Sequence, residues 1–264
     1  MSEPWTVRAV RYATRVTPKS ALFYDYAVFG EPDVPFRTDY FFWLLSRPGE
    51  TIVVDVGFGA DTAARMDREL VRAPAQALAE LGVRADRVVL THLHWDHTAN
   101  LDLFPGAELL APAAELDFWS GPLATHPHFA PHARAQDLET IARARSEGRL
   151  TALSPDDEVA PGVRSITVGG HAVGQSVLVV DTAAGPVILA SDAFHFYEEY
   201  ELRRPFAICA DLVGALRAFD VLRELSQDGR HPIVAGHDPL VMERFPRWAG
   251  DPAGLTVEVG ATPR

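Results

Sequence analysis

The sequence contains almost no cysteine. Cys209 is the only one among 264 residues, so the chain can form neither an internal disulfide nor a cysteine-rich zinc site. Any metal must therefore be held by histidine, aspartate or glutamate side chains. Cys209 follows the apolar residues Phe206, Ala207 and Ile208, and we interpret it as a small buried side chain rather than a nucleophile.

Positive charge and long apolar segments are also scarce. The chain has 24 Lys and Arg against 36 Asp and Glu, a net charge of -12, which disfavours a nucleic acid as partner because phosphates are repelled. The longest apolar runs, such as 40–45 and 177–180, fall far short of the roughly 20 residues that span a bilayer. The N-terminal residues do not resemble a signal peptide. We therefore expect a cytoplasmic protein without a membrane partner.

The size and patterning of the chain predict one globular domain over residues 1–264. The hydrophobic content of 47% is sufficient for a large core, and no linker or repeat divides the sequence. Short apolar segments alternate with helical patterns. We expect strands at 40–45 and 51–56, joined as a hairpin, and at 87–90, 108–111, 163–168, 176–180, 187–190 and 232–235. We expect helices at 60–81 (interrupted near Pro74), within 113–150 and at 212–225. This order predicts two packed sheets with helices outside them.

The segment His92-Leu93-His94-Trp95-Asp96-His97 directly follows an expected strand. In an extended segment alternate side chains point the same way, so His92 and His94 can hold one ion. Asp96 and His97 can then reach a second position nearby. Imidazole and carboxylate together suit zinc and, less selectively, iron, manganese or cobalt. A histidine-rich surface loop is the alternative, but four ligands within six residues favour a metal site.

The His-x-His-x-Asp-His segment resembles the signature of the metallo-β-lactamase superfamily of metal-dependent hydrolases. Later residues match the remaining ligand positions in order: His171 between glycine-containing segments, Asp192 after an apolar strand, and His237 after the last strand. The resemblance extends over about residues 38–245. It implies an α+β fold, a four-layer αβ/βα sandwich with the metals at one edge.

The resemblance also implies a ligand set for two divalent ions, with zinc as the expected metal. One ion would be held by His92, His94 and His171, and the other by Asp96, His97 and His237. Asp192 would bridge both ions together with a hydroxide that attacks the substrate carbonyl.

Two aspartates have further expected roles. Asp96 is a candidate catalytic proton shuttle, with a purely metal-binding role as the alternative. Asp55, at the end of the strand 51–56, resembles the aspartate that lies behind the metal histidines in this superfamily. There it would accept the second N–H of a ligating imidazole. The alternative is that Asp55 stabilises the glycine-rich turn that follows.

Within the superfamily the chain most resembles the N-acyl homoserine lactone lactonases, because of its length, the position of Asn100 and the segment Gly236-His237-Asp238. The implied reaction is the opening of a lactone ring in a small-molecule substrate, an activity known as quorum quenching. Those lactonases carry a substrate-contacting tyrosine where this chain has His195. We expect His195 to supply the same hydrogen bond, the alternative being a surface histidine.

Aromatic residues supply the other expected substrate contacts. Tyr197 and Phe23 are candidates to line the substrate pocket, with core packing or contacts in a homodimer as the alternative for Phe23 and its aromatic neighbours. The loop containing His126, His128 and His132 is interpreted as a cover over the site rather than a second metal site.

Other functions are less consistent with the residues. Hydrolysis of another small ester, amide or thioester by the same metal centre is the main alternative. A thioesterase of the glyoxalase II type would need a basic patch for glutathione, and the C-terminal region offers only scattered arginines such as Arg244 and Arg247. A nuclease is disfavoured by the net charge. A binding protein that lost its chemistry is disfavoured because every ligand position is occupied.

Overall fold

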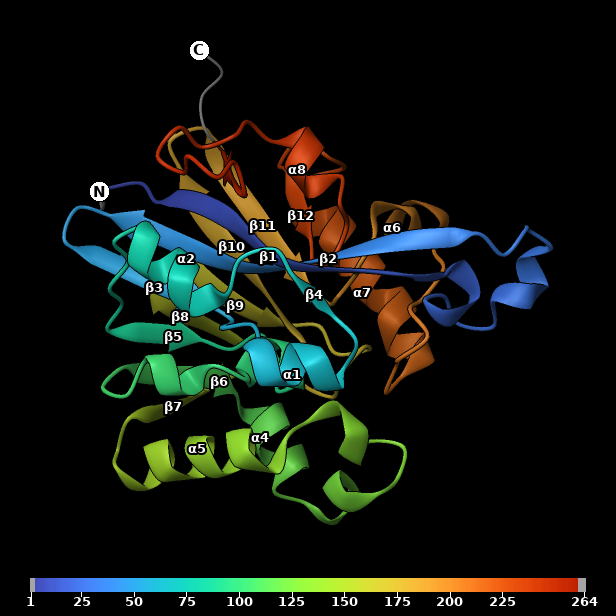
Figure 1. The fold of residues 1–264 in the computed structure, drawn as a ribbon, viewed down its shortest axis with the longest axis horizontal. Coiled ribbons are helices and arrows are strands. Elements are labelled where there is room, and N and C mark those ends of the chain that lie inside the picture. Colours follow the sequence, from blue (N-terminus) through green and yellow to red (C-terminus); the bar gives the residue numbers. More distant parts are fainter. Residues whose placement is uncertain (1–2, 261–264) are drawn as a thin grey trace.

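The computed structural model describes residues 3–260 and contains two sheets packed face to face (Figure 1). The first has eight strands in the order β13-β1-β2-β3-β5-β6-β7, with β4 paired to β1, and the second has the order β12-β11-β10-β9-β8. The strands of the first sheet are β1 (Thr6–Pro18), β2 (Pro35–Arg47), β3 (Glu50–Val54), β4 (Glu69–Leu70), β5 (Arg87–Val89), β6 (Glu108–Pro112), β7 (Leu150–Leu153) and β13 (Thr256–Val259). Those of the second are β8 (Asp156–Ala160), β9 (Val163–Thr167), β10 (Ser176–Thr182), β11 (Gly185–Ser191) and β12 (Ile233–Ala235).

Helices cover the outer faces of both sheets. The α-helices are α1 (Ala60–Arg65), α2 (Pro74–Glu80), α3 (Trp95–Thr98), α4 (Ala113–Trp119), α5 (Ala135–Ser146), α6 (Tyr197–Leu202), α7 (Leu212–Leu225) and α8 (Val241–Arg244). Short 3-10 turns are η1 (Lys19–Ala21), η2 (Tyr26–Phe29), η3 (Leu101–Leu103), η4 (Pro122–Thr125) and η5 (Ala130–His132). Within residues 3–260 no helix is both long and apolar enough to cross a membrane.

The central strand β2 explains why the layers hold together. Its residues 40–45 are all buried, because the two faces of the strand pack on different partners. Phe41, Trp43 and Leu45 face the second sheet, whereas Tyr40 and Phe42 pack with the apolar residues of α1, α2, α4 and α5. A strand that is buried on both faces becomes a continuous apolar run rather than an alternating one. The predicted four-layer αβ/βα sandwich is confirmed.

The structure differs from the expected elements mainly at the N-terminal edge of the first sheet. Strand β1 forms a long hairpin with β2 (Figure 1), but it has no continuous apolar run because Arg8, Arg11 and Arg15 interrupt it. The region 60–81, expected to be helical with an interruption near Pro74, forms two helices with the short strand β4 between them. Asp67 adopts a left-handed conformation with φ 52° between α1 and β4, and Pro74 begins α2.

Six of the seven expected metal ligands follow strands that end at one edge of the sandwich. Strands β3 and β5 pair in parallel within the first sheet, and β11 and β12 pair in parallel within the second. The carboxyl ends of all four strands meet there, which is the position where ligand sites form in α/β sheets. Residues 55, 92–97, 192 and 237 directly follow these strands.

We predict that Asp251 is a major contributor to the stability of this fold. Its two carboxylate oxygens pair with the Nη1 and Nη2 atoms of Arg72 at 2.9 and 2.8 Å, and it also accepts a bond from Thr256 in β13. Both charged residues are buried, and the other carboxylate near Arg72, that of Glu80, is 3.4 Å away and largely exposed. Asp251→Ala would therefore leave the buried guanidinium without its main partner and lower the free energy of unfolding by about 3–5 kcal/mol.

Urea unfolding measures this loss, and Asp156→Ala is the matched control. Asp156 pairs with Arg164 at 2.8 Å, but both side chains are more than half exposed, so its loss should cost no more than about 1 kcal/mol. Equal destabilisation by the two substitutions would contradict the prediction.

Candidate metal centre

Three histidines from both sheets form the first ligand cluster. His92 and His94 lie in the loop after β5, and His171 lies in the loop between β9 and β10. Their candidate ligand atoms all lie within 4.8 Å of one another, and His94 Nδ1 is 2.9 Å from His171 Nε2. The side chains are buried. The structure thus brings together the three residues that the resemblance assigned to one ion.

The second cluster comprises Asp96 and His97 from α3, Asp192 after β11 and His237 after β12. Asp192 lies between the two clusters: its Oδ1 is 3.1 Å from His237 Nε2, and its Oδ2 is 3.5 Å from His171 Nε2 and also from His97 Nε2. A single carboxylate can therefore reach both ion positions. All seven expected ligands lie in these two clusters.

The site contains buried ligand atoms without hydrogen-bond partners, as a site for divalent ions requires. His92 Nε2, His97 Nε2 and Asp192 Oδ1 are buried and have no hydrogen-bond partner among the described residues, an arrangement that costs about 1–3 kcal/mol per group unless a ligand satisfies it. Burial, followed by the charge of neighbouring imidazoles, holds the pKa of His92, His94 and His171 well below the usual histidine value. They are therefore neutral, which is the form that binds metal.

Asp55 lies directly behind this centre. Its Oδ2 is 2.7 Å from His97 Nδ1 and accepts a bond from Thr91 Oγ1 at 2.9 Å, while its Oδ1 accepts the Thr91 N–H at 2.9 Å. Burial lowers the pKa of His97, but Asp192, Asp55 and then Asp96 outweigh it, and the pKa rises well above its usual value. Asp55 thus orients the imidazole through the nitrogen that faces away from the second cluster.

Two residues at the strand ends adopt conformations that side chains rarely take. Asp55 has φ 56° and Ser191 has φ 45°, both in the left-handed region. Ser191 Oγ lies 2.8 Å from Thr91 Oγ1 and 3.4 Å from Asp55 Oδ2. Backbone strain of this kind concentrates at functional sites, where surrounding bonds maintain it.

The loop that carries His171 requires glycine. Gly170 has φ 89°, and a Cβ atom at this position would lie 2.5 Å from the backbone of Ala215 in α7. The Gly170 carbonyl also accepts the backbone N–H groups of Ala210 and Asp211. His171 Nδ1 in turn lies 3.0 Å from the Ile208 carbonyl. Helix α7 and the segment before it thereby fix the position of this ligand.

His195 is inside the site rather than on the surface. It is 2% exposed, its ring stacks on Phe206 at 3.6 Å, and its Nε2 lies 3.1 Å from Asp192 Oδ2. Its Nδ1 lies 3.1 Å from Glu199 Oε2. Burial lowers the pKa of His195, but Asp192 and Glu199 outweigh it and raise the pKa to about 9.

The expected substrate contacts of Tyr197 and Phe23 are not supported, and both expectations are corrected. Tyr197 is buried in the core between the sheet and α8, and its hydroxyl donates to the carbonyl of Ile233. Phe23 is 1% exposed in an aromatic cluster with Tyr26 and Phe196. Neither lines the pocket over the metal ligands. Aromatic composition alone does not distinguish core packing from pocket lining.

The pocket over the ligands has a volume of about 110 Å³. Several of the residues that line it were not predicted from the sequence. Besides the metal ligands it is lined by Arg15, Leu22, Thr38, Tyr40, Arg68, His132, His195, Phe206 and Ile208, among others. The loop residue His132 is close to the centre, with its ring 5.3 Å from that of His94. Among the described residues, His126, His128 and His132 belong to none of the clusters that could hold a metal.

Glu115 in α4 is a positioning residue that sequence analysis missed. Its Oε2 accepts the N–H of Leu93, between the first two histidine ligands, at 2.9 Å. Its Oε1 accepts the N–H of Gly174, in the His171 loop, at 2.8 Å. Trp119 Nε1 donates a third bond at 3.0 Å. One buried carboxylate therefore holds together the two loops that supply the first cluster. No motif marks it.

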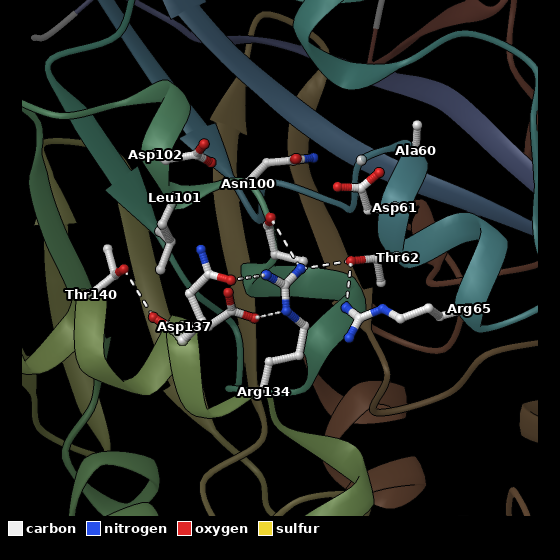
Figure 2. Close-up of a pocket in the computed structure, with 13 residues that line it drawn as sticks. Ala60, Asp61, Thr62, Arg65, Asn100, Leu101, Asp102, Arg134, Asp137 and Thr140 are labelled. Atoms are coloured by element: carbon white, nitrogen blue, oxygen red, sulfur yellow. Dashed lines mark hydrogen bonds and ion pairs between the residues drawn. The ribbon is translucent and has the colours of Figure 1, made fainter.

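A larger cavity of about 620 Å³ is lined by α1, by the segment that follows α3 and by the start of α5 (Figure 2), and none of the expected metal ligands lines it. Arg134 spans it, donating to Thr62 Oγ1 at 2.6 Å and to the Ala99 carbonyl at 3.5 Å. Asp137 accepts a bond from Thr98 Oγ1 at 3.1 Å. These contacts fix the end of α3, which carries Asp96 and His97, so the cavity walls support the metal centre from outside.

Comparison with known proteins identifies the family. Residues 37–237 match the family described as the metallo-beta-lactamase superfamily, and this segment covers most of the chain. The chain belongs to the metallo-beta-lactamase superfamily.

Among curated proteins the chain is similar to N-acyl homoserine lactonases. The AiiB protein of Agrobacterium fabrum is 29% identical over 170 residues, which cover 62% of this chain and 61% of that protein. The AiiB protein of Rhizobium rhizogenes is 30% identical over 155 residues, covering 57% and 56%. A lactonase of a Bacillus species is 28% identical over 152 residues, covering 57% and 55%. The matched segments thus span less than two thirds of the length of these relatives.

Solved structures share the fold. An N-acyl homoserine lactone hydrolase with the product N-hexanoyl-L-homoserine at its catalytic metal centre superposes with a TM-score of 0.72 at 19% identity, covering 92% of this chain and 97% of that one. The dizinc quorum-quenching lactonase AidC superposes with a TM-score of 0.70 at 15% identity, covering 100% and 97%.

We predict that Glu115→Gln weakens metal binding at the first cluster. An amide cannot accept hydrogen bonds at both ends, so one of the two ligand loops is released, and loss of such an outer partner costs about 10–100-fold in metal affinity. Competition with a chromophoric chelator would show one of two zinc-binding steps weakened. Glu139→Gln, at an exposed position of α5, serves as control. Two unchanged binding steps would contradict the role assigned to Glu115.

Proposed function

We propose that the protein is a zinc-dependent hydrolase that opens the ring of a small lactone. The observation that carries this proposal is the pair of buried ligand clusters joined by Asp192 beneath a pocket of about 110 Å³. The curated relatives named as N-acyl homoserine lactonases support a lactone as the substrate. Histidines and carboxylates without thiolates are ligands that zinc accepts readily.

Two ions held by these residues would supply a water that is deprotonated near neutral pH and would polarise the substrate carbonyl. The chain holds the ligands in a rigid, largely water-excluded frame: His97 is oriented by Asp55, His171 by the Ile208 carbonyl and His237 by the Asp39 carbonyl at 3.0 Å. Fixed ligands need no reorganisation during the reaction, which lowers the barrier.

Asp96 is suited to moving a proton. Its Oδ1 lies 3.8 Å from His97 Nε2 and its Oδ2 lies 3.8 Å from His237 Nε2. Its side chain is 14% exposed and lines the pocket, whereas the side chain of Asp192 is only 4% exposed. We assign to the Asp96 carboxylate the transfer of a proton from the attacking water to the ring oxygen that leaves.

His195 is placed to bind a substrate oxygen. Its Nε2 is buried, lines the pocket and has no hydrogen-bond partner of good geometry, while Glu199 and Phe206 hold the ring in place. A donor fixed beside the reacting carbonyl stabilises the negative charge that develops there.

We predict that removal of metal abolishes hydrolysis. Chelator-treated protein should lose at least about 100-fold in kcat/KM, because the ions supply several kcal/mol of transition-state stabilisation, and added zinc should restore it. The assay would use an N-acyl homoserine lactone, γ-butyrolactone, and an ester, thioester and amide of one acyl group. Full activity without metal would exclude the mechanism, and turnover of ester or thioester without lactone would exclude the proposed substrate.

We further predict that His195→Phe lowers kcat/KM by about 100-fold, the usual cost of losing one transition-state donor, while two zinc ions per chain remain bound. Phenylalanine retains the stacking on Phe206. His126→Phe, at an exposed position, is the control for histidine loss. Metal analysis separates the alternatives: loss of zinc in His195→Phe would make His195 a ligand, as its membership of a third cluster with His171 and Asp192 allows.

A further inference from the structure

Two arginines line the pocket over the metal ligands, and neither has a carboxylate partner. Arg15 comes from β1, and Arg68 comes from the turn before β4. Burial, and then the charge of Arg68, lowers the pKa of Arg15, and Tyr40 and Asp67 oppose this shift only in part. Two like charges gathered at one pocket are unfavourable unless an anion joins them.

The other arginines of the β1–β2 hairpin are paired. Arg8 pairs with Glu258 at 3.2 Å, Arg11 and Arg37 pair with Asp39 at 3.2 and 2.8 Å, and Arg47 pairs with Glu50 at 2.5 Å. In contrast, the side chain of Arg15 makes no ion pair and no hydrogen bond with any residue in the range 3–260, and its Nε is buried without a partner. The hairpin therefore leaves one guanidinium free, at the pocket.

Arg68 is held so that it faces the same pocket. Its guanidinium lies 5.6 Å from the ring centre of Tyr40 and 5.5 Å from that of Trp95, and its Nε donates to the Tyr40 hydroxyl. The ring of Tyr40 in turn lies 4.9 Å from that of the metal ligand His237. Aromatic faces and backbone carbonyls, rather than acidic groups, position this cation.

A third donor lies beside the arginines. Thr38 pairs with Arg15 across the β1–β2 ladder and lines the pocket. It is 5% exposed, and its hydroxyl has no hydrogen-bond partner within the described part of the chain. Two cations and an unpaired hydroxyl thus meet on the wall of the pocket next to the metal ligands.

We propose that Arg15, Arg68 and Thr38 form an anion-binding subsite, so that the substrate carries a carboxylate or phosphate group beside the bond that is hydrolysed. Guanidinium groups bind both anions through two parallel charge-assisted hydrogen bonds. This inference rests on the proposed function and specifies its substrate class. It departs from N-acyl homoserine lactones, which carry no charge.

The larger cavity in Figure 2 provides a comparison, because its arginine Arg134 has partners for its guanidinium group. There Arg134 lies 3.4 Å from Asp137 and donates to Thr62 and to Gln136. That cavity also contains Asp61 and Asp102, so its arginines are balanced by acidic groups. The pocket of Arg15 and Arg68 also contains Asp96 and Asp192, but both carboxylates belong to the second ligand cluster, and within the described residues neither pairs with an arginine.

Binding to the zinc-loaded protein tests the subsite without turnover. Butyrate has one carboxylate for the metals, whereas succinate and phosphonopropionate add a second anionic group of similar reach. We expect either dianion to bind at least about tenfold more tightly than butyrate by calorimetry. The tighter of the two shows whether the subsite prefers carboxylate or phosphate.

Arg15→Gln should reduce this preference to about twofold or less, and Arg15→Lys should retain part of it, since lysine keeps the charge but not the paired donors. Arg164→Gln, which removes the same charge from an exposed position outside the pocket, should leave it unchanged. The proposal would be overturned if the natural protein bound all three probes equally. It would also be overturned if the Arg15→Gln, Arg68→Gln double variant kept the preference for the dianions.

Hydrolysis provides a separate comparison. A γ-butyrolactone bearing a ring carboxylate should have a kcat/KM at least about tenfold above that of γ-butyrolactone, and Arg15→Gln should remove the difference. If neither lactone is hydrolysed while the binding preference holds, the proposed lactonase function fails and the subsite stands. If both lactones react equally and the probes bind equally, the subsite fails and the lactonase function stands.

Discussion

The geometry of the metal centre depends on the hydrogen bonds of the Asp55 carboxylate. This carboxylate joins the end of β3 to Thr91 after β5 and, through the hydroxyls of Thr91 and Ser191, to the end of β11 in the opposite sheet, while also orienting His97. These hydrogen bonds fix the position of the two sheets relative to each other at the edge where the ligands converge. The left-handed backbone at Asp55 and Ser191 is maintained because these bonds would be lost if either residue relaxed.

Sequence patterns predicted those parts of the site that follow strands. The metal-binding character of the segment 92–97 and the two-sheet order were predictable from the residues, because apolar runs mark buried strands and the histidines follow one of them. His171, Asp192, His237 and Asp55 were expected only through the resemblance to the superfamily. The pocket walls were not. Arg15 lies on a strand whose periodicity is broken by arginines, and Glu115 acts through two backbone N–H groups that only the folded chain brings together. Tyr197 and Phe23 failed as substrate contacts because aromatic side chains satisfy the core equally well.

The charge of the chain is distributed unevenly, so that its net charge does not describe the pocket. The net charge of -12 belongs mostly to exposed surface, whereas the pocket gathers Arg15 and Arg68 over a centre suited to two divalent cations. The negative surface of the protein repels anions at a distance, whereas the positive charges of the pocket attract an anion that has come close. This arrangement favours small anions that can approach closely over extended polyanions.

The ligands of the first cluster come from both sheets, since His92 and His94 follow β5 and His171 precedes β10. Each bound ion therefore acts as a reversible cross-link between the two halves of the sandwich. By mass action, an ion present at 100 times its dissociation constant adds about 2.7 kcal/mol to the free energy of unfolding. Free metal concentration would thus determine how long the folded protein persists, so that metal starvation would remove the protein and not only empty its metal centre.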